Sequence, residues 1–135
     1  MSIYLETKDL INTQQMEVAV NGPDGSTHLI LCTGTANLGP VSHEIYTFLV
    51  GPQISFRQFV GVIVSGALST IQADNKSFAT EHADSQIEAN LISIAANYDD
   101  DSGQVKVNAE VTSNPEMRKL AITYNVSILA ELPSY

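Results

Sequence analysis

The segment LAITYNVSILAEL, residues 120–132, decides the fold because apolar and polar side chains alternate along it. Its even-numbered positions are all apolar, namely Leu120, Ile122, Tyr124, Val126, Ile128, Ala130 and Leu132. Side chains of a β-strand point to opposite faces in turn, whereas a helix would spread this set around its circumference. The segment therefore predicts a strand with one buried side. It is longer than the usual strand of ~5–6 residues, so we expect a bend or bulge that lets it serve both layers of a sandwich.

A hairpin is predicted just before this strand. Residues 104–112 alternate in the same way, with apolar side chains at the odd positions Val105, Val107, Ala109 and Val111. Residues 86–97 carry apolar side chains at both parities, which predicts a strand buried on both faces. The link between them, residues 97–103, contains Asp and Gly, which suit a turn, so the two strands are expected to pair.

The first half of the chain also has a β pattern. Residues 44–50 and 58–64 are rich in Val, Ile, Phe and Tyr and are separated by Gly51 and Pro52, which end one strand and begin a turn. Residues 16–20 and 27–33 flank the turn sequence NGPDGS and predict a second hairpin. Two stretches stay open. Residues 66–85 fit an irregular connection, a short helix or a strand plus loop, and residues 2–14 fit a sheet edge or one helical turn.

These elements predict an all-β fold of about seven strands. No amphipathic helices of ten to fifteen residues separate the strands, which favours an antiparallel β-sandwich or a jelly-roll-like barrel over a parallel α/β sheet. The chain contains no internal repeat and no linker-like Pro/Gly/Ser run. Residues 1–135 are therefore expected to form a single domain.

Composition limits the partners that this chain is expected to have. Apolar residues make up 44% and charged residues 16%, which favours a compact fold over disorder. Six Lys and Arg against fifteen Asp and Glu give a net charge of −9, which repels nucleic acid and anionic lipid. The longest apolar run, residues 59–64, is far below the ~20 residues of a membrane span, and the first residues show no secretory signal pattern. We expect a soluble protein without nucleic-acid or membrane partners, and its localisation stays open.

Motifs of catalysis are missing from the sequence. Its single cysteine, Cys32, excludes an intrachain disulfide and a zinc site built on thiolates, and the apolar run around it predicts a buried side chain. The chain has no Gly-x-Ser-x-Gly motif, no phosphate-binding glycine loop and no closely spaced His pair. We therefore expect a protein that is not an enzyme and needs no cofactor.

Three polar features are candidates for ligand contact. Asp99 and Asp101 lie in an acidic turn that fits a weak calcium site, because hard cations take several oxygen ligands, although Asp-rich hairpin tips are common without metal. Tyr98 precedes this turn and offers an aromatic face for a sugar, or else packs beneath its own loop. His82 lies in a polar stretch, which leaves it free to meet a ligand.

Residues 56–132 resemble the H-type lectin domain. The resemblance rests on the strand VGVIVSG at residues 60–66, the polar connection ADNK at 73–76, strands at 87–97 and 105–111, and the closing strand AITYNVSIL at 121–129. It implies a six-stranded antiparallel sandwich that assembles as a trimer or hexamer and binds galactose-type or N-acetylgalactosamine sugars. It further implies that Asp74 and Asn75 match the family's polar sugar loop, and that Arg118 reaches the ligand from a neighbouring turn.

Two functions of different classes follow from these observations. The first is a multivalent carbohydrate-binding module, in which Asp74, Asn75 and Tyr98 bind sugar hydroxyls and a homo-oligomer supplies avidity. The second is a structural or assembly subunit, such as a virion, tail or secreted-complex component, whose β-sandwich buries an apolar face against copies of itself.

Overall fold

The computed structural model describes residues 2–20, 27–72 and 88–131, and it confirms the all-β fold. Its strands are β1 (Ser2–Tyr4), β2 (Leu10–Ala19), β3 (Thr27–Val50), β4 (Phe59–Gln72), β5 (Glu88–Asp99) and β6 (Gln104–Glu131). One 3-10 turn, η1 (Thr7–Asp9), connects β1 to β2. No helix of the described residues is long and apolar enough to span a membrane.

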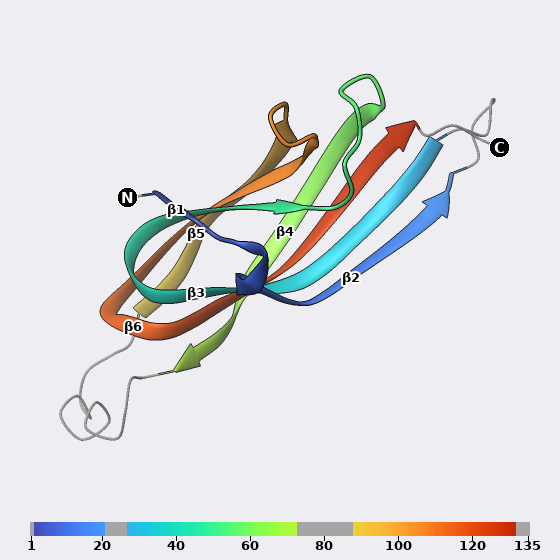
Figure 1. The fold of residues 1–135 in the computed structure, drawn as a ribbon. Helices are drawn as coiled ribbons and strands as arrows, with labels where there is room; N and C mark the ends of the chain where they lie inside the picture. The colour runs from blue at the N-terminus through green and yellow to red at the C-terminus, as the bar shows by residue number, and fades with distance from the viewer. Residues whose placement is uncertain (1, 21–26, 73–87, 132–135) are drawn as a thin grey trace.

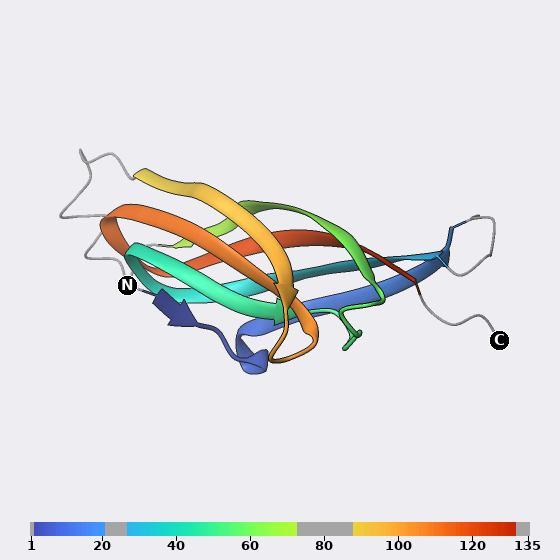
Figure 2. The ribbon, with the colours of Figure 1, turned by 90° about the horizontal axis from the view of Figure 1, so that it is seen from above.

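Two long strands bend and so belong to both layers of a sandwich (Figures 1 and 2). Residues 27–37 of β3 pair with residues 121–131 of β6, and residues 43–50 of β3 pair with residues 105–112 of β6. We call layer A the segments β2, 27–37 of β3, 121–131 of β6 and β4, in that order. Layer B consists of β1, 43–50 of β3, 105–112 of β6 and β5. Each layer thus holds four strand segments.

The bend in β3 has a local cause. The register between β3 and β6 shifts three times between Asn37 and His43, and Gly39 adopts a φ of +73°, which glycine reaches without steric cost. Such bulges increase the local twist and turn the strand out of the plane of its sheet. The predicted transfer between layers is therefore confirmed, but it falls before residue 120 rather than within residues 120–132.

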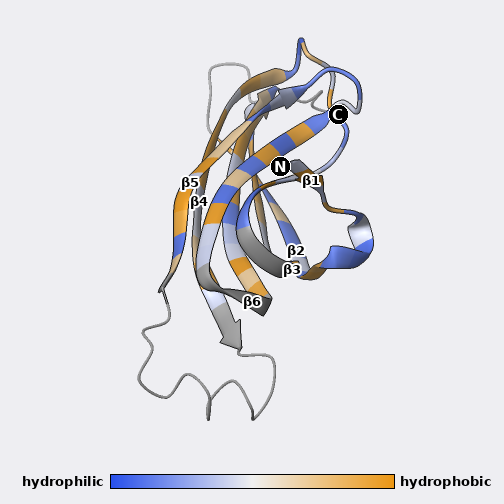
Figure 3. Cartoon of the chain, turned by 90° about the vertical axis from the view of Figure 1, so that its left-hand side faces the viewer, coloured by the Kyte–Doolittle hydropathy of each residue, from blue (hydrophilic) through white to orange (hydrophobic). Residues whose placement is uncertain are grey.

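The core lies between the layers. The alternation that builds it is visible as alternating hydrophobic and hydrophilic colours along the strands in Figure 3. Along β6, Val105, Val107, Ala109 and Val111 are buried in layer B, and Ile122, Tyr124, Val126, Ile128 and Ala130 are buried in layer A. The two layers touch at the rings of Phe48 and Tyr124, whose centroids are 5.2 Å apart. Burial of these side chains supplies the main driving force for folding.

Both predicted hairpins are confirmed, since β2 pairs antiparallel with β3, and β5 with β6. Three other expectations need correction. The predicted strands at 27–33 and 44–50 are one strand, and residues 104–112 and 120–131 likewise belong to one strand, while residue 132 lies outside the described residues. The described part of the chain thus has six strands and eight segments in place of the expected seven strands. The sheet is not purely antiparallel, because β1 runs parallel to β3. Strand β5 is an edge strand with one face exposed, not a strand buried on both faces.

The two open stretches are partly settled. Residues 2–14 contain an edge strand and one 3-10 turn, followed by the start of β2. Residues 66–72 continue β4, and residues 73–87 lie outside the described residues.

Candidate functional site

Four of the predicted ligand-binding residues fall where the structure describes no side chain. Asp74, Asn75 and His82 lie outside the described residues. Arg118 belongs to β6, but its side chain is outside the described part of that strand. The sugar loop that the lectin resemblance implies therefore stays a prediction.

Tyr98 is the predicted ligand-binding residue whose surroundings are described. Its hydroxyl donates a hydrogen bond to the carbonyl of Ile54 at 2.7 Å. Its ring lies 5.3 Å from that of Phe59 and 5.8 Å from that of Phe56, measured between centroids. Tyr98 thus packs against the connection between β3 and β4, and its hydroxyl holds that connection in place. The Tyr98 hydroxyl therefore donates its hydrogen bond within the protein and not to a ligand.

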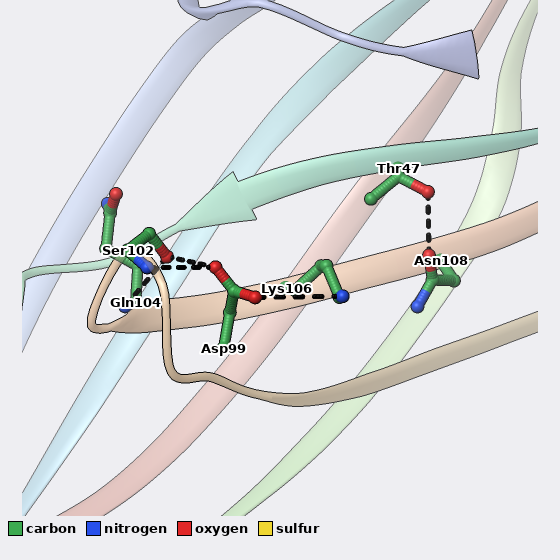
Figure 4. Close-up of polar contacts among 6 residues, drawn as sticks. All are labelled: Thr47, Asp99, Ser102, Gln104, Lys106 and Asn108. Carbon is green, nitrogen blue, oxygen red and sulfur yellow. Dashed lines mark hydrogen bonds and ion pairs between the residues drawn. The ribbon is translucent and has the colours of Figure 1, made fainter. Parts of the chain in front are cut away.

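The acidic turn between β5 and β6 is organised by its own hydrogen bonds (Figure 4). The Asp99 carboxylate accepts hydrogen bonds from the Ser102 hydroxyl at 2.6 Å and the Ser102 amide at 3.1 Å, and Lys106 Nζ lies 3.7 Å from its other oxygen. The Ser102 hydrogen bonds, helped by Lys106, lower the pKa of Asp99 below its ordinary value.

This geometry bears on the predicted calcium site. Asp101 is exposed at the tip of the turn, while both oxygens of Asp99 already contact protein groups. Within the described ranges, no group of three or more His, Cys, Asp and Glu side chains is placed to hold a metal ion. The calcium site at Asp99 and Asp101 therefore stays a prediction without support from the described side chains.

The outer face of layer B carries polar side chains that pair across strands, beside Ile45, which is 39% exposed. His43 Nε2 lies 2.6 Å from a Glu110 carboxylate oxygen. The Thr47 hydroxyl donates a hydrogen bond to Asn108 Oδ1 at 2.7 Å, as Figure 4 shows. Such cross-strand pairs suit a surface that faces water.

The outer face of layer A has the opposite character. Register places Val18, Leu29, Leu129 and Gly61 in one row across four strands, and Met16, Leu31, Ser127 and Ile63 in the next. We call the six large side chains of these rows the apolar face: Met16, Val18, Leu29, Leu31, Ile63 and Leu129. Ile63 is 76% exposed, Met16 62% and Val18 43%. Adjacent exposed apolar side chains of this kind mark interaction surfaces on soluble proteins.

Polarity along β2 is the reverse of that expected for a sandwich. Gln15 and Glu17 pair with the buried residues Cys32 and Ile30, so they lie on the core side of the sheet. Met16 and Val18 lie on the outer side. Antiparallel sheets with one solvated face normally show apolar side chains inward and polar ones outward. The exposed apolar side chains of β2, Met16 and Val18, therefore lie on its outer side.

Strand β2 is also an open edge. It ends the strand order of layer A, and residues 11–20 are all exposed. Natural edge strands are commonly protected by Lys, Pro or a bulge. β2 has a bulge between Ile11 and Gln14, but residues 14–19 form a regular ladder without Lys or Pro.

Sequence reasoning did not identify the apolar face. The sequence does contain a relevant pattern. Residues 29–31 and 62–64 are apolar at both odd and even positions, which predicts strands with apolar side chains on both faces. The same two-sided pattern in residues 86–97 predicts burial on both faces, yet Ile92 of β5 is 54% exposed. The pattern alone therefore does not show which strand has an uncovered apolar face.

Comparison of the chain with protein-family models, with curated proteins and with solved structures finds no match. The resemblance to the H-type lectin domain thus stays a prediction, and the functional argument depends on the chain's own residues.

Proposed function

We propose that this chain is a non-catalytic assembly subunit that associates with a second copy of itself through the apolar face of layer A. The observation that carries the proposal is the pair of apolar rows, in which Ile63 is 76% and Met16 62% exposed. Covering these side chains removes apolar surface from water, which favours association.

Charge favours a second copy over other occupants. Each chain carries a net charge of −9, so two copies repel one another unless they meet where charge is absent. The outer-side positions of residues 29–35, 61–67 and 123–129 contain no ionisable side chain, and Glu131 lies beyond them at the strand end. A basic partner would find no carboxylate on this face, whereas an identical face is compatible with it.

Geometry also fits two identical faces. Two sheets pack face to face at about 10 Å, with their side chains interdigitating. A two-fold axis that runs along the strands places Met16 of one copy over Ile63 of the partner subunit, so each of these exposed side chains covers the other. The contact is isologous and closes on itself. The predicted trimer or hexamer is a separate expectation, and only a hexamer of dihedral symmetry contains two-fold contacts.

Sedimentation equilibrium of the wild type and of Ile63→Thr tests the proposal. Threonine keeps β-branching but loses roughly 1 kcal/mol of apolar burial in each copy, or about 2 kcal/mol per dimer, so the dimer dissociation constant should rise about thirty-fold. Ile92→Thr is the matched control, because Ile92 is 54% exposed on β5, outside the apolar face. It should leave association unchanged. Equal effects of the two substitutions would contradict the proposed surface.

A further inference from the structure

A second feature of the molecule lies apart from the apolar face. A cavity of about 220 Å³ opens between β2 and the ends of the two layers, and its inner wall includes Cys32 and Tyr124. Gln14 and Gln15 line its mouth and are exposed, while Val50 and Gly51 line the side formed by β3 and the residue after it. The cavity therefore connects solvent to the edge of the core.

Tyr124 presents a polar group to this cavity. Its side chain is 2% exposed, and it lines the cavity together with Cys32. A hydroxyl on the wall of a cavity gains a hydrogen bond from a ligand or water that occupies the cavity. Cys32, 4% exposed, lies beside Tyr124, and burial raises the pKa of both groups. Both are neutral at pH 7.

Two glycines lie in close contact with the side chains around this cavity. A Cβ atom on Gly34 would lie 2.5 Å from the Tyr124 hydroxyl oxygen, so only glycine lets that side chain take its position. A Cβ atom on Gly51 would lie 2.8 Å from Ile128 Cδ1 and 3.4 Å from Cys32 Sγ, and Gly51 has a φ of +81°, which other residues rarely adopt. The backbone of β3 and of the residue after it therefore passes close to Tyr124 and Cys32.

We propose that this cavity binds a small uncharged ring compound with a hydroxyl group. A cavity of roughly 150 Å³ holds benzene, so about 220 Å³ holds a six-membered ring with a substituent. Leu10, Leu49 and Val50 contact the ring, and the Tyr124 hydroxyl exchanges a hydrogen bond with the substituent. None of the described lining residues is charged, which disfavours anions and cations.

Phenol is the probe that tests this site. Cys32 is the only cysteine of the chain, so its reaction with N-ethylmaleimide is followed by the mass of the intact protein. Phenol should slow this reaction in a saturable manner, and benzoate should not. Amide resonances of Val50 and Gly51 should shift over the same range of phenol concentration. Unchanged reaction rates at high phenol concentration would overturn the proposal.

Tyr124→Phe separates hydrogen bonding from simple filling of space. It removes the hydroxyl and keeps the ring, so the phenol dissociation constant should rise about two- to twelve-fold, the value of one hydrogen bond. Toluene, which lacks the hydroxyl, should bind the wild type and the variant equally. If Tyr124→Phe folds poorly, the comparison of phenol with toluene on the wild-type protein still tests the proposal. Toluene that binds the wild type as tightly as phenol would contradict the assigned role of the hydroxyl.

Discussion

Gly34→Ala should destabilise the protein because the Tyr124 side chain already occupies the place of the added methyl group. The added Cβ would lie 2.5 Å from the hydroxyl oxygen of Tyr124 and 2.8 Å from its Cζ, well inside contact distance. The Tyr124 ring is 2% exposed and packs against Phe48, so it has little freedom to move away. Overpacking of this kind costs about 1–3 kcal/mol. Gly61→Ala is the matched control, since its Cβ meets nothing within 4 Å, and it should stay within about 0.5 kcal/mol of the wild type.

Urea denaturation at one fixed protein concentration measures both variants, because association adds to apparent stability. The double variant Gly34→Ala with Tyr124→Leu should lose less free energy of unfolding than the sum of the single changes, by about 1 kcal/mol or more, since the second change removes the clashing ring. Strict additivity, or a Gly34→Ala protein as stable as the Gly61→Ala protein, would refute the packing argument.

Two further predictions concern pH. The pKa of Asp99 is lowered from 3.8, mainly by the hydrogen bond from the Ser102 side chain and to a smaller extent by Lys106. The ionised carboxylate therefore stabilises the folded protein above pH 3.8, and this stabilisation is lost as the pH falls through the lowered pKa of the folded state. In an NMR titration, Ser102→Ala should raise the pKa of Asp99 more than Lys106→Gln does, and the reverse order would be inconsistent with the geometry. Burial, and secondarily the charge of Glu44, raises the pKa of Tyr46 to about 12, so stability that is complete below pH 10 is lost as pH rises toward 12. Tyr46→Phe should lose less stability in this range by circular dichroism, and an equal loss in both proteins would argue against Tyr46 as the source.

Periodicity predicted the strands because alternation is a local property of the sequence. Residues 104–112 and 120–130 carry apolar side chains at every second position without interruption, and these apolar side chains of both segments form the inner face of β6. What lies between them was not predictable in the same way. Gly39 and Pro40 in one strand and Pro115 in the other are typical of turns, yet both strands continue through these residues. The continuity depends on pairing between β3 and β6, which no local pattern contains.

The candidate surface was less predictable than the fold. The alternating pattern shows which residues share a face of a strand. Whether the other layer of the sandwich covers that face depends on how far that layer extends, which the pattern does not show. In β2 the usual placement of apolar side chains toward the core is reversed. Gln15 and Glu17 lie on the core side and remain exposed, while Met16 and Val18 lie on the outer side. Likewise, the exposure of Tyr98 expected from its place before a turn is reduced by Ile54 and Phe59, which are distant in sequence.

The mass of the unmodified chain in solution tests the proposed role of the apolar face most directly. Sedimentation equilibrium over a wide concentration range should show a reversible species of at least twice the 14.5 kDa of one chain. A mass of 14.5 kDa at every concentration would contradict self-association through layer A.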